Sequence, residues 1–130
     1  MLTIQHLTKH YKGSSKGVTD LSLTVRPGDI YAFIGHNGAG KTTTLKCIAG
    51  IHGFDEGEIF INGFNIKKDP LGCKRSIAYI PDNPDLYEYL TGVQYLNFIA
   101  DVFQVEAAKR KERIKKYADA FEITPSLGDL

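Results

Sequence analysis

The sequence Gly35-His36-Asn37-Gly38-Ala39-Gly40-Lys41-Thr42 matches the pattern G-x-x-x-x-G-K-[ST] at every fixed position. The five residues before it, 30–34, are all apolar or aromatic, which predicts a central strand covered on both faces. Residues 42–50 after it have the hydrophobic period of a helix, and Gly50 is suited to end that helix. A glycine-rich turn between a buried strand and a helix predicts an α/β fold with a phosphate-binding loop.

Residues 35–43, which we call the phosphate loop, have the chemistry to hold a triphosphate. Backbone N–H groups at a helix N-terminus donate to phosphate oxygens, and glycines let the main chain approach them closely. We expect the Lys41 ammonium between the β- and γ-phosphates, the Thr42 hydroxyl on Mg²⁺, and Thr43 nearer the α-phosphate. The predicted nucleotide-binding residues of the loop are Gly35, His36, Asn37, Gly38, Ala39, Gly40, Lys41, Thr42 and Thr43.

Short segments on both sides of the loop show the patterns of strands. Asn62-Gly63 supplies the two positive-φ positions of a type I′ turn, so it predicts a hairpin around it. Pro84 predicts an irregular loop over residues 81–88. The predicted strand segments are residues 2–7 and 21–25, which form a first hairpin, the second hairpin of residues 58–66, and residues 76–80.

Beyond residue 89 the hydrophobic period changes from two to 3.6 residues, which predicts helices. Thr91 is suited to cap a first helix that contains Tyr95 and Phe103, and residues 105–121 predict a second. We therefore treat residues 1–130 as one domain, with a core over residues 1–88 that holds the hairpins and the phosphate loop. Residues 89–130 begin a helical subdomain.

The composition excludes several classes of protein. The 130 residues are 42% hydrophobic, which is too apolar for a disordered chain. Cys47 and Cys73 lack the spacing of a zinc site or a disulfide framework, and no apolar run is long enough to cross a bilayer. The start lacks the features of a signal peptide, so we expect a soluble chain in the cytoplasm.

Charge gives little support for a nucleic-acid partner. Sixteen Lys and Arg residues stand against 15 Asp and Glu residues, for a net charge of +1. Six of the eight residues 109–116 are basic, but their offsets surround the solvent side of an amphipathic helix. We therefore interpret them as a solvated face, the alternatives being a nucleic-acid patch or contact with an anionic membrane surface.

The loop pattern alone admits kinases, GTPases, motor proteins and transport ATPases. The absence of an Asn-Lys-x-Asp sequence disfavours a GTPase, and the 34 residues before the loop disfavour a small kinase. The chain resembles the ATP-binding cassette (ABC) ATPases over essentially its whole length. The segments that carry this resemblance are the phosphate loop, residues 57–63, residues 77–82, residues 86–88 and residues 90–92. The Tyr-Glu and Leu-Thr-Gly sequences of the last two are similar to the efflux-type branch of the family.

This resemblance implies a P-loop NTPase core with an antiparallel β subdomain and the beginning of a helical subdomain, an incomplete cassette that binds ATP and Mg²⁺. Tyr11 occupies the family position of an aromatic residue that stacks on adenine; the alternative is that it packs the first hairpin. Asp82 stands where the family commonly has a glutamine that contacts Mg²⁺. A carboxylate suits Mg²⁺ as a ligand through water, but Asp82 is also suited to cap the loop.

The resemblance also implies partners. It places the protein on the inner face of the cell membrane, bound to a membrane-spanning transporter subunit and paired with a second ATPase subunit. The signature sequence and the Walker B strand of the family are not found in the 130 residues. We therefore assign no catalytic residue and expect this chain alone to hydrolyse ATP poorly. The alternatives are a soluble cassette ATPase that acts on ribosomes or DNA, and a non-catalytic nucleotide-binding fragment.

Overall fold

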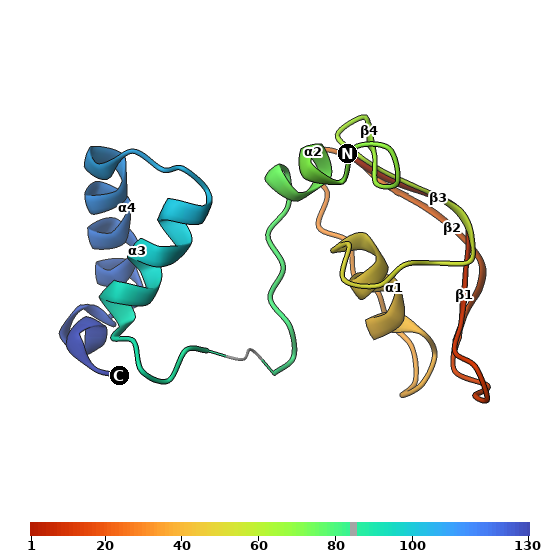
Figure 1. The fold of residues 1–130 in the computed structure, drawn as a ribbon, viewed down its shortest axis with the longest axis horizontal. Coiled ribbons are helices and arrows are strands. Elements are labelled where there is room, and N and C mark those ends of the chain that lie inside the picture. Colours follow the sequence, from red (N-terminus) through yellow and green to blue (C-terminus); the bar gives the residue numbers. More distant parts are fainter. Residues whose placement is uncertain (84–85) are drawn as a thin grey trace. The chain divides into compact units, whose positions relative to one another are not determined.

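The computed structural model describes residues 1–83 and 86–130, and these form two compact units, Met1–Ile80 and Pro81–Leu130 (Figure 1). The first unit holds a sheet with two helices, and the second holds helices only. Pro84, on which the expectation of an irregular loop rested, lies outside the described residues. No helix within the described ranges combines the length and the apolar character needed to cross a bilayer.

The sheet of the first unit contains four antiparallel strands in the order β2-β1-β3-β4. Strands β1 (Leu2–His10) and β2 (Gly17–Val25) form the predicted first hairpin, and β3 (Glu56–Ile61) and β4 (Phe64–Asn65) form the second. Asn62 and Gly63 have φ values of 49° and 86°, which confirms the predicted turn.

Helix α1 (Lys41–Ile48) packs on the sheet and completes the core of this unit (Figure 1). It ends as predicted, because Gly50 follows with a left-handed φ of 68° and its N–H donates to the carbonyl oxygen of Cys47. The core residues come from both strands and helices: Ile4, Leu7, Cys47, Ile59, Ile61 and Cys73.

The predicted strands over residues 30–34 and 76–80 are wrong. The structure has no strand at either segment, and Ile30, Ile34 and Ile80 are at least 87% exposed. A strand persists only when neighbouring strands pair with its N–H and C=O groups. Each of the four strands that the structure describes pairs within the β2-β1-β3-β4 sheet, so these two segments have no such neighbour among the described residues.

Helix α2 (Pro70–Arg75) was not predicted. Its start has a recognisable signal, because the Asp69 carboxylate accepts a hydrogen bond from the N–H of Gly72 at 2.8 Å and proline occupies the first helical position. The helix buries Cys73 in the core and ends at Ser76, where residues 76–80 were expected to begin a strand.

The second unit confirms both predicted helices, α3 (Gly92–Val102) and α4 (Ala107–Ala120), and adds a 3₁₀ turn, η1 (Thr124–Gly128). Thr91 caps α3 in a reciprocal arrangement with Gln94, whose side chain accepts from the Thr91 N–H at 2.9 Å. Arg110 joins the two helices, because its guanidinium donates to Asp101 at 2.5 Å and to Asn97 at 3.3 Å.

The basic residues of α4 mostly face solvent, as the sequence predicts. Lys109 pairs with Glu106 at 2.8 Å and Lys115 pairs with Asp119 at 2.7 Å, while Arg110 is half-buried.

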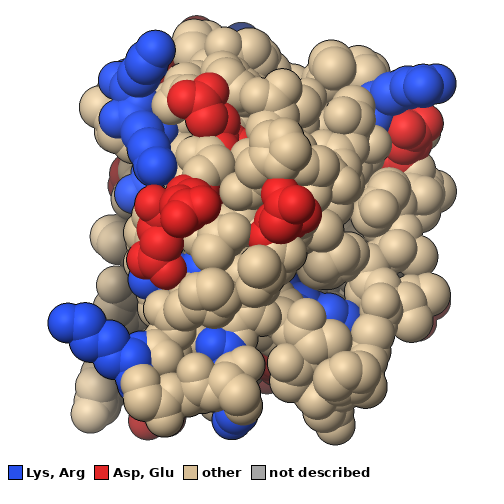
Figure 2. All heavy atoms as spheres, turned by 90° about the vertical axis from the view of Figure 1, so that its right-hand side faces the viewer, with Lys and Arg blue, Asp and Glu red and all other residues tan. Residues whose placement is uncertain are grey.

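On the face of the molecule seen from the side of the sheet, acidic and basic side chains both occur in small groups (Figure 2). That face therefore has no extended surface of a single charge sign.

Candidate phosphate-binding site

The last three residues of the phosphate loop, 41–43, form the start of α1, as expected, whereas the strand expected before the loop is not found among the described residues. Gly38 and Gly40 have φ values of 86° and 91°, in the region that favours glycine. A Cβ on Gly40 would collide with the carbonyl oxygen of Gly17 in β2, so the main chain of the loop passes close against the sheet. The loop is therefore held by its own backbone conformation and by contact with β2.

Lys41 places its positive charge within the loop. Its Nζ donates hydrogen bonds to the carbonyl oxygens of Gly35 and, at 2.7 Å, of His36. An ammonium group has three donors, so two are used here and a third is available to a phosphate oxygen. Both of these hydrogen bonds are exposed to solvent, so the ammonium is accessible to an anion.

The first turn of α1 adds further donors and no competing acid. The backbone N–H of Thr44 donates to the carbonyl oxygen of Gly40 at 2.9 Å, which is the first hydrogen bond of the helix. The N–H groups of the residues before Thr44 have no acceptor within the helix, because no carbonyl lies four residues before them in it. Every residue of this first turn is described, and none is acidic. The helix dipole and free amides together favour an anion at this end of α1.

Thr42 and Thr43 follow Lys41 with different exposures. The Thr42 side chain is exposed, which leaves its hydroxyl accessible to a hydrated cation, whereas Thr43 is half-buried. The described residues contain no cluster of three or more His, Cys, Asp or Glu side chains that would hold a metal ion. A single hydroxyl beside phosphate oxygens fits Mg²⁺, which commonly keeps several waters and takes few protein ligands.

The structure brings Tyr11 to the phosphate loop. Its hydroxyl lies 3.4 Å from the Thr43 hydroxyl, and its ring stands nearly perpendicular to that of His52, with the centroids 6.1 Å apart. The Lys9 ammonium lies 5.7 Å from the centre of the Tyr11 ring. The Tyr11 ring and the candidate phosphate-binding loop therefore belong to the same unit.

Asp82 is exposed and belongs to the second unit. Its predicted contact with Mg²⁺ stays a prediction.

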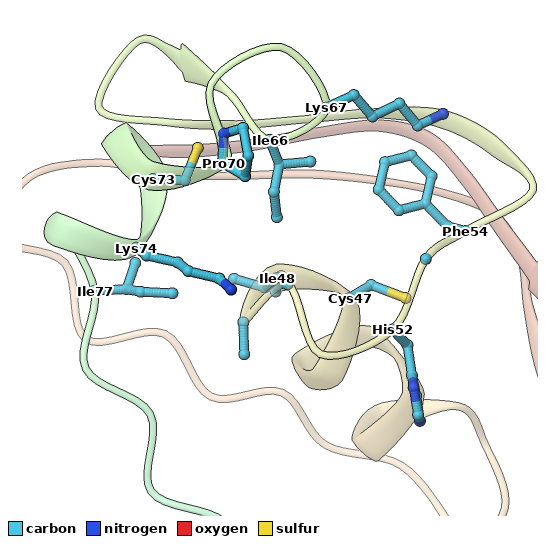
Figure 3. Close-up of a pocket in the computed structure, with 13 residues that line it drawn as sticks. Cys47, Ile48, His52, Phe54, Ile66, Lys67, Pro70, Cys73, Lys74 and Ile77 are labelled. Atoms are coloured by element: carbon cyan, nitrogen blue, oxygen red, sulfur yellow. The ribbon is translucent and has the colours of Figure 1, made fainter.

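A separate cavity of about 220 Å³ lies toward the other end of α1, with Cys47, Ile66 and Cys73 among its lining residues (Figure 3). Burial raises the pKa of both the Cys47 and the Cys73 thiol, so the thiols are neutral and poorly nucleophilic. The first residue in the sequence that lines this cavity is Cys47, so no residue of the phosphate loop lines it. The loop is therefore the candidate site on chemical grounds, because it gathers the donors that an anion needs.

Sequence reasoning missed two contributors to the site. Gly17 limits the space beside Gly40, and His52 contacts Tyr11. Both contacts arise from tertiary packing between residues far apart in the chain, and no local pattern around either residue signals them.

Comparison with known proteins agrees with this geometry. The family model described as ABC transporter matches residues 18–128. The chain belongs to the ABC transporter family. The resemblance inferred from the loop and the flanking segments is thereby confirmed.

Two curated relatives of this ABC chain are named as transport or export ATP-binding proteins. The choline transport ATP-binding protein OpuBA of Bacillus subtilis (strain 168) is 33% identical in an alignment 130 residues long that covers 99% of this chain and 34% of that protein. The SkfA peptide export ATP-binding protein SkfE of the same organism is 36% identical over 114 residues, 88% of this chain and 46% of that protein. These relatives leave the efflux-type branch a prediction.

Solved ABC structures share the fold. A solved structure of the ATP binding subunit of an ABC transporter matches 98% of this chain and 53% of its own, with a TM-score of 0.89 and 32% identity. The dimeric cassette MJ0796, bound to ADP and Pi, matches 89% of this chain and 55% of its own, with a TM-score of 0.75 and 20% identity. The predicted fold class is confirmed: a P-loop ATPase fold with an antiparallel sheet. The ABC chain spans about half of each solved chain.

Proposed function

We propose that this ABC chain binds Mg-ATP at the phosphate loop, as part of the energy-supplying subunit of a membrane transporter. The proposal rests on the position of Lys41 at the start of α1. Its ammonium donates hydrogen bonds to the carbonyl oxygens of Gly35 and His36 in the loop. A cation and free helix amides at one point form a site for a polyanion.

Each part of the site has a separate task. The backbone N–H groups of the phosphate loop donate to phosphate oxygens, apart from that of Ala39, which already donates to the His36 carbonyl oxygen at 3.1 Å. Lys41 would neutralise charge on the β- and γ-phosphates, and the Thr42 hydroxyl would be a ligand for Mg²⁺. Tyr11 offers an aromatic ring to the base, since every nucleobase has a π face on which an aromatic side chain stacks. When bound, Mg²⁺ neutralises charge on the phosphate oxygens.

The wider setting is also part of the proposal. The named relatives are transport ATP-binding proteins, and MJ0796 is dimeric, which supports a second ATPase subunit and a membrane-spanning subunit as partners. In that setting the chain lies on the cytoplasmic side of the membrane, without a nucleic-acid partner. Asp82 remains a candidate Mg²⁺ contact.

This chain alone is proposed to bind ATP without steady turnover. Phosphoryl transfer needs a positioned water and charge stabilisation beyond the phosphate cradle. The 130 residues contain no sequence that resembles the signature motif or the Walker B strand. Steady phosphate release that Lys41→Ala abolishes would contradict this part of the proposal.

Binding itself is tested by following backbone amide resonances during titration with Mg-ATP. We expect the largest shifts at residues 35–43, and we expect adenosine without phosphates to leave these amides nearly unchanged. Saturable shifts confined to other parts of the chain would contradict binding at the loop.

A further inference from the structure

The ring of Tyr11 is held from more than one direction in the first unit. Its hydroxyl contacts Thr43, in the first turn of α1, at 3.4 Å. The ring of His52, beyond the end of the same helix, stands at 79° to it with the centroids 6.1 Å apart. The Tyr11 ring therefore has contacts with both ends of the α1 region.

His52 is itself anchored to α1. The backbone N–H groups of Ile51 and His52 both donate to the carbonyl oxygen of Lys46, at 2.9 Å and 3.2 Å. These bonds satisfy a carbonyl of the last helical turn and fix the direction in which the chain leaves α1. The position of the imidazole thus follows from the end of the helix.

The His52 side chain has no evident task in the nearby cavity. Its imidazole points away from the side chains of Ile66, Pro70 and Cys73, which line the cavity on its other side (Figure 3). The ring is half-buried, and its aromatic contact is with Tyr11. A perpendicular arrangement of two rings is a favoured geometry for an aromatic pair, so the contact restricts the orientation of Tyr11.

Lys9 approaches the same ring, with its ammonium 5.7 Å from the ring centre. This ammonium also lies 3.6 Å from the carboxylate of Asp55, so its charge is shared between the ring and an acid. His52 differs from Lys9 because its contact is ring to ring and depends on shape more than on charge.

We propose that His52 is a positioning residue, which holds the Tyr11 ring in the orientation needed to stack on the base of a bound nucleotide. The inference rests on the proposed function, because it assumes that Tyr11 receives the base while the loop receives the phosphates. A ring that is already ordered loses less conformational freedom when the ligand binds. His52 therefore contributes to affinity for a nucleotide and not to affinity for a bare polyphosphate.

The test compares two ligands by calorimetry with the full 130-residue chain: Mg-ATP, and magnesium tripolyphosphate, which has no base. We expect His52→Ala to raise the dissociation constant for Mg-ATP by about threefold to tenfold, the range expected when one side chain must be ordered on binding. The constant for tripolyphosphate should stay unchanged. Lys41→Ala should weaken both ligands.

Two further substitutions separate the ring contact from general packing. His52→Phe keeps an aromatic ring and should restore the affinity for Mg-ATP, whereas His52→Leu fills similar space without a ring and should behave as His52→Ala does. This pair decides the question even if the alanine variant fails to fold. Ile51→Ala, at the exposed neighbouring position, is the matched control and should bind both ligands as the unmodified chain does.

Three results would overturn the inference: unchanged binding of Mg-ATP by His52→Leu, equal weakening of both ligands, or failure of His52→Phe to restore affinity. If Lys41→Ala leaves the dissociation constants of both ligands unchanged, the proposed function is contradicted, and the inference about His52 with it. Because the Lys41 and His52 variants are measured with the same two ligands, a failure of the proposed function can be distinguished from a failure of the inference about His52.

Discussion

The hydroxyl of Tyr11 lies 3.4 Å from the hydroxyl of Thr43, although the two residues are 32 positions apart in the chain. This contact joins the end of β1 to the first turn of α1. Thr43 belongs to the phosphate loop, so the aromatic ring and the phosphate cradle are coupled within Met1–Ile80. The residues proposed to bind the base and the phosphates of a nucleotide therefore lie within one unit.

Replacing Tyr11 tests whether its ring binds the base or packs the first hairpin. If the ring stacks on the base, Tyr11→Ala should weaken Mg-ATP binding by about 1–3 kcal/mol, as loss of a base-stacking residue commonly does. Tyr11→Phe removes only the long hydroxyl contact and should bind nearly as the unmodified chain does. A variant that unfolds at lower temperature yet binds Mg-ATP normally would favour the packing role.

Gly40→Ala tests the backbone of the phosphate loop. The added Cβ would collide with the carbonyl oxygen of Gly17, and φ at this position is 91°, so we expect a loss of about 1–3 kcal/mol in unfolding free energy from backbone strain alone. Urea denaturation measures the loss. Gly53→Ala is the control, because a Cβ there meets open space, and it should change stability by less than about 0.5 kcal/mol. Equal stabilities of the two variants would be inconsistent with the close approach of the loop to β2.

Asp55 predicts a dependence of stability on pH. The hydrogen bond from the backbone N–H of His10, at 2.7 Å, lowers the pKa of this carboxyl, and the nearby Lys9 ammonium lowers it further. Because the folded pKa lies below the unfolded value of about 3.9, the ionised carboxylate stabilises the fold above that pH. This contribution is lost as the pH falls through the folded pKa.

The variant Asp55→Asn removes the charge and keeps an oxygen acceptor. We expect it to be less stable than the unmodified chain near pH 7, and we expect the difference to vanish as the pH is lowered below 4. Denaturation at a series of pH values measures the difference. A difference that stays constant from pH 7 to below the folded pKa would rule out the charge as its cause.

Much of the local structure follows from short sequence signals. Asn62-Gly63 predicts the second hairpin because few residue pairs accept two positive φ values, and Thr91 predicts the start of α3 because its hydroxyl caps the helix. The phosphate loop is predicted in the same way, and its binding of phosphate stays a prediction. Its glycines and Lys41 are required at fixed spacing by the ligand that such loops bind.

The predictions that were wrong or missing concern contacts between residues far apart in the sequence. Residues 30–34 have the composition of a central strand, but composition does not supply the neighbouring strands that would pair with them. His52 becomes part of the site only because the chain leaving α1 places it against Tyr11. Such contacts depend on how elements pack, and a single sequence contains no local pattern for them.

The most direct test of nucleotide binding at the phosphate loop is the dissociation constant of Mg-ATP for the unmodified chain, for Lys41→Ala and for Lys74→Ala, measured by calorimetry. Lys74 is an exposed lysine of α2, beside the cavity at the far end of α1, and serves as the charge-matched control. The account predicts that Lys41→Ala weakens binding by about tenfold to a hundredfold, the range for a lost hydrogen bond to a charged group, while Lys74→Ala changes it little. Equal effects of the two substitutions, or none from Lys41→Ala, would contradict it.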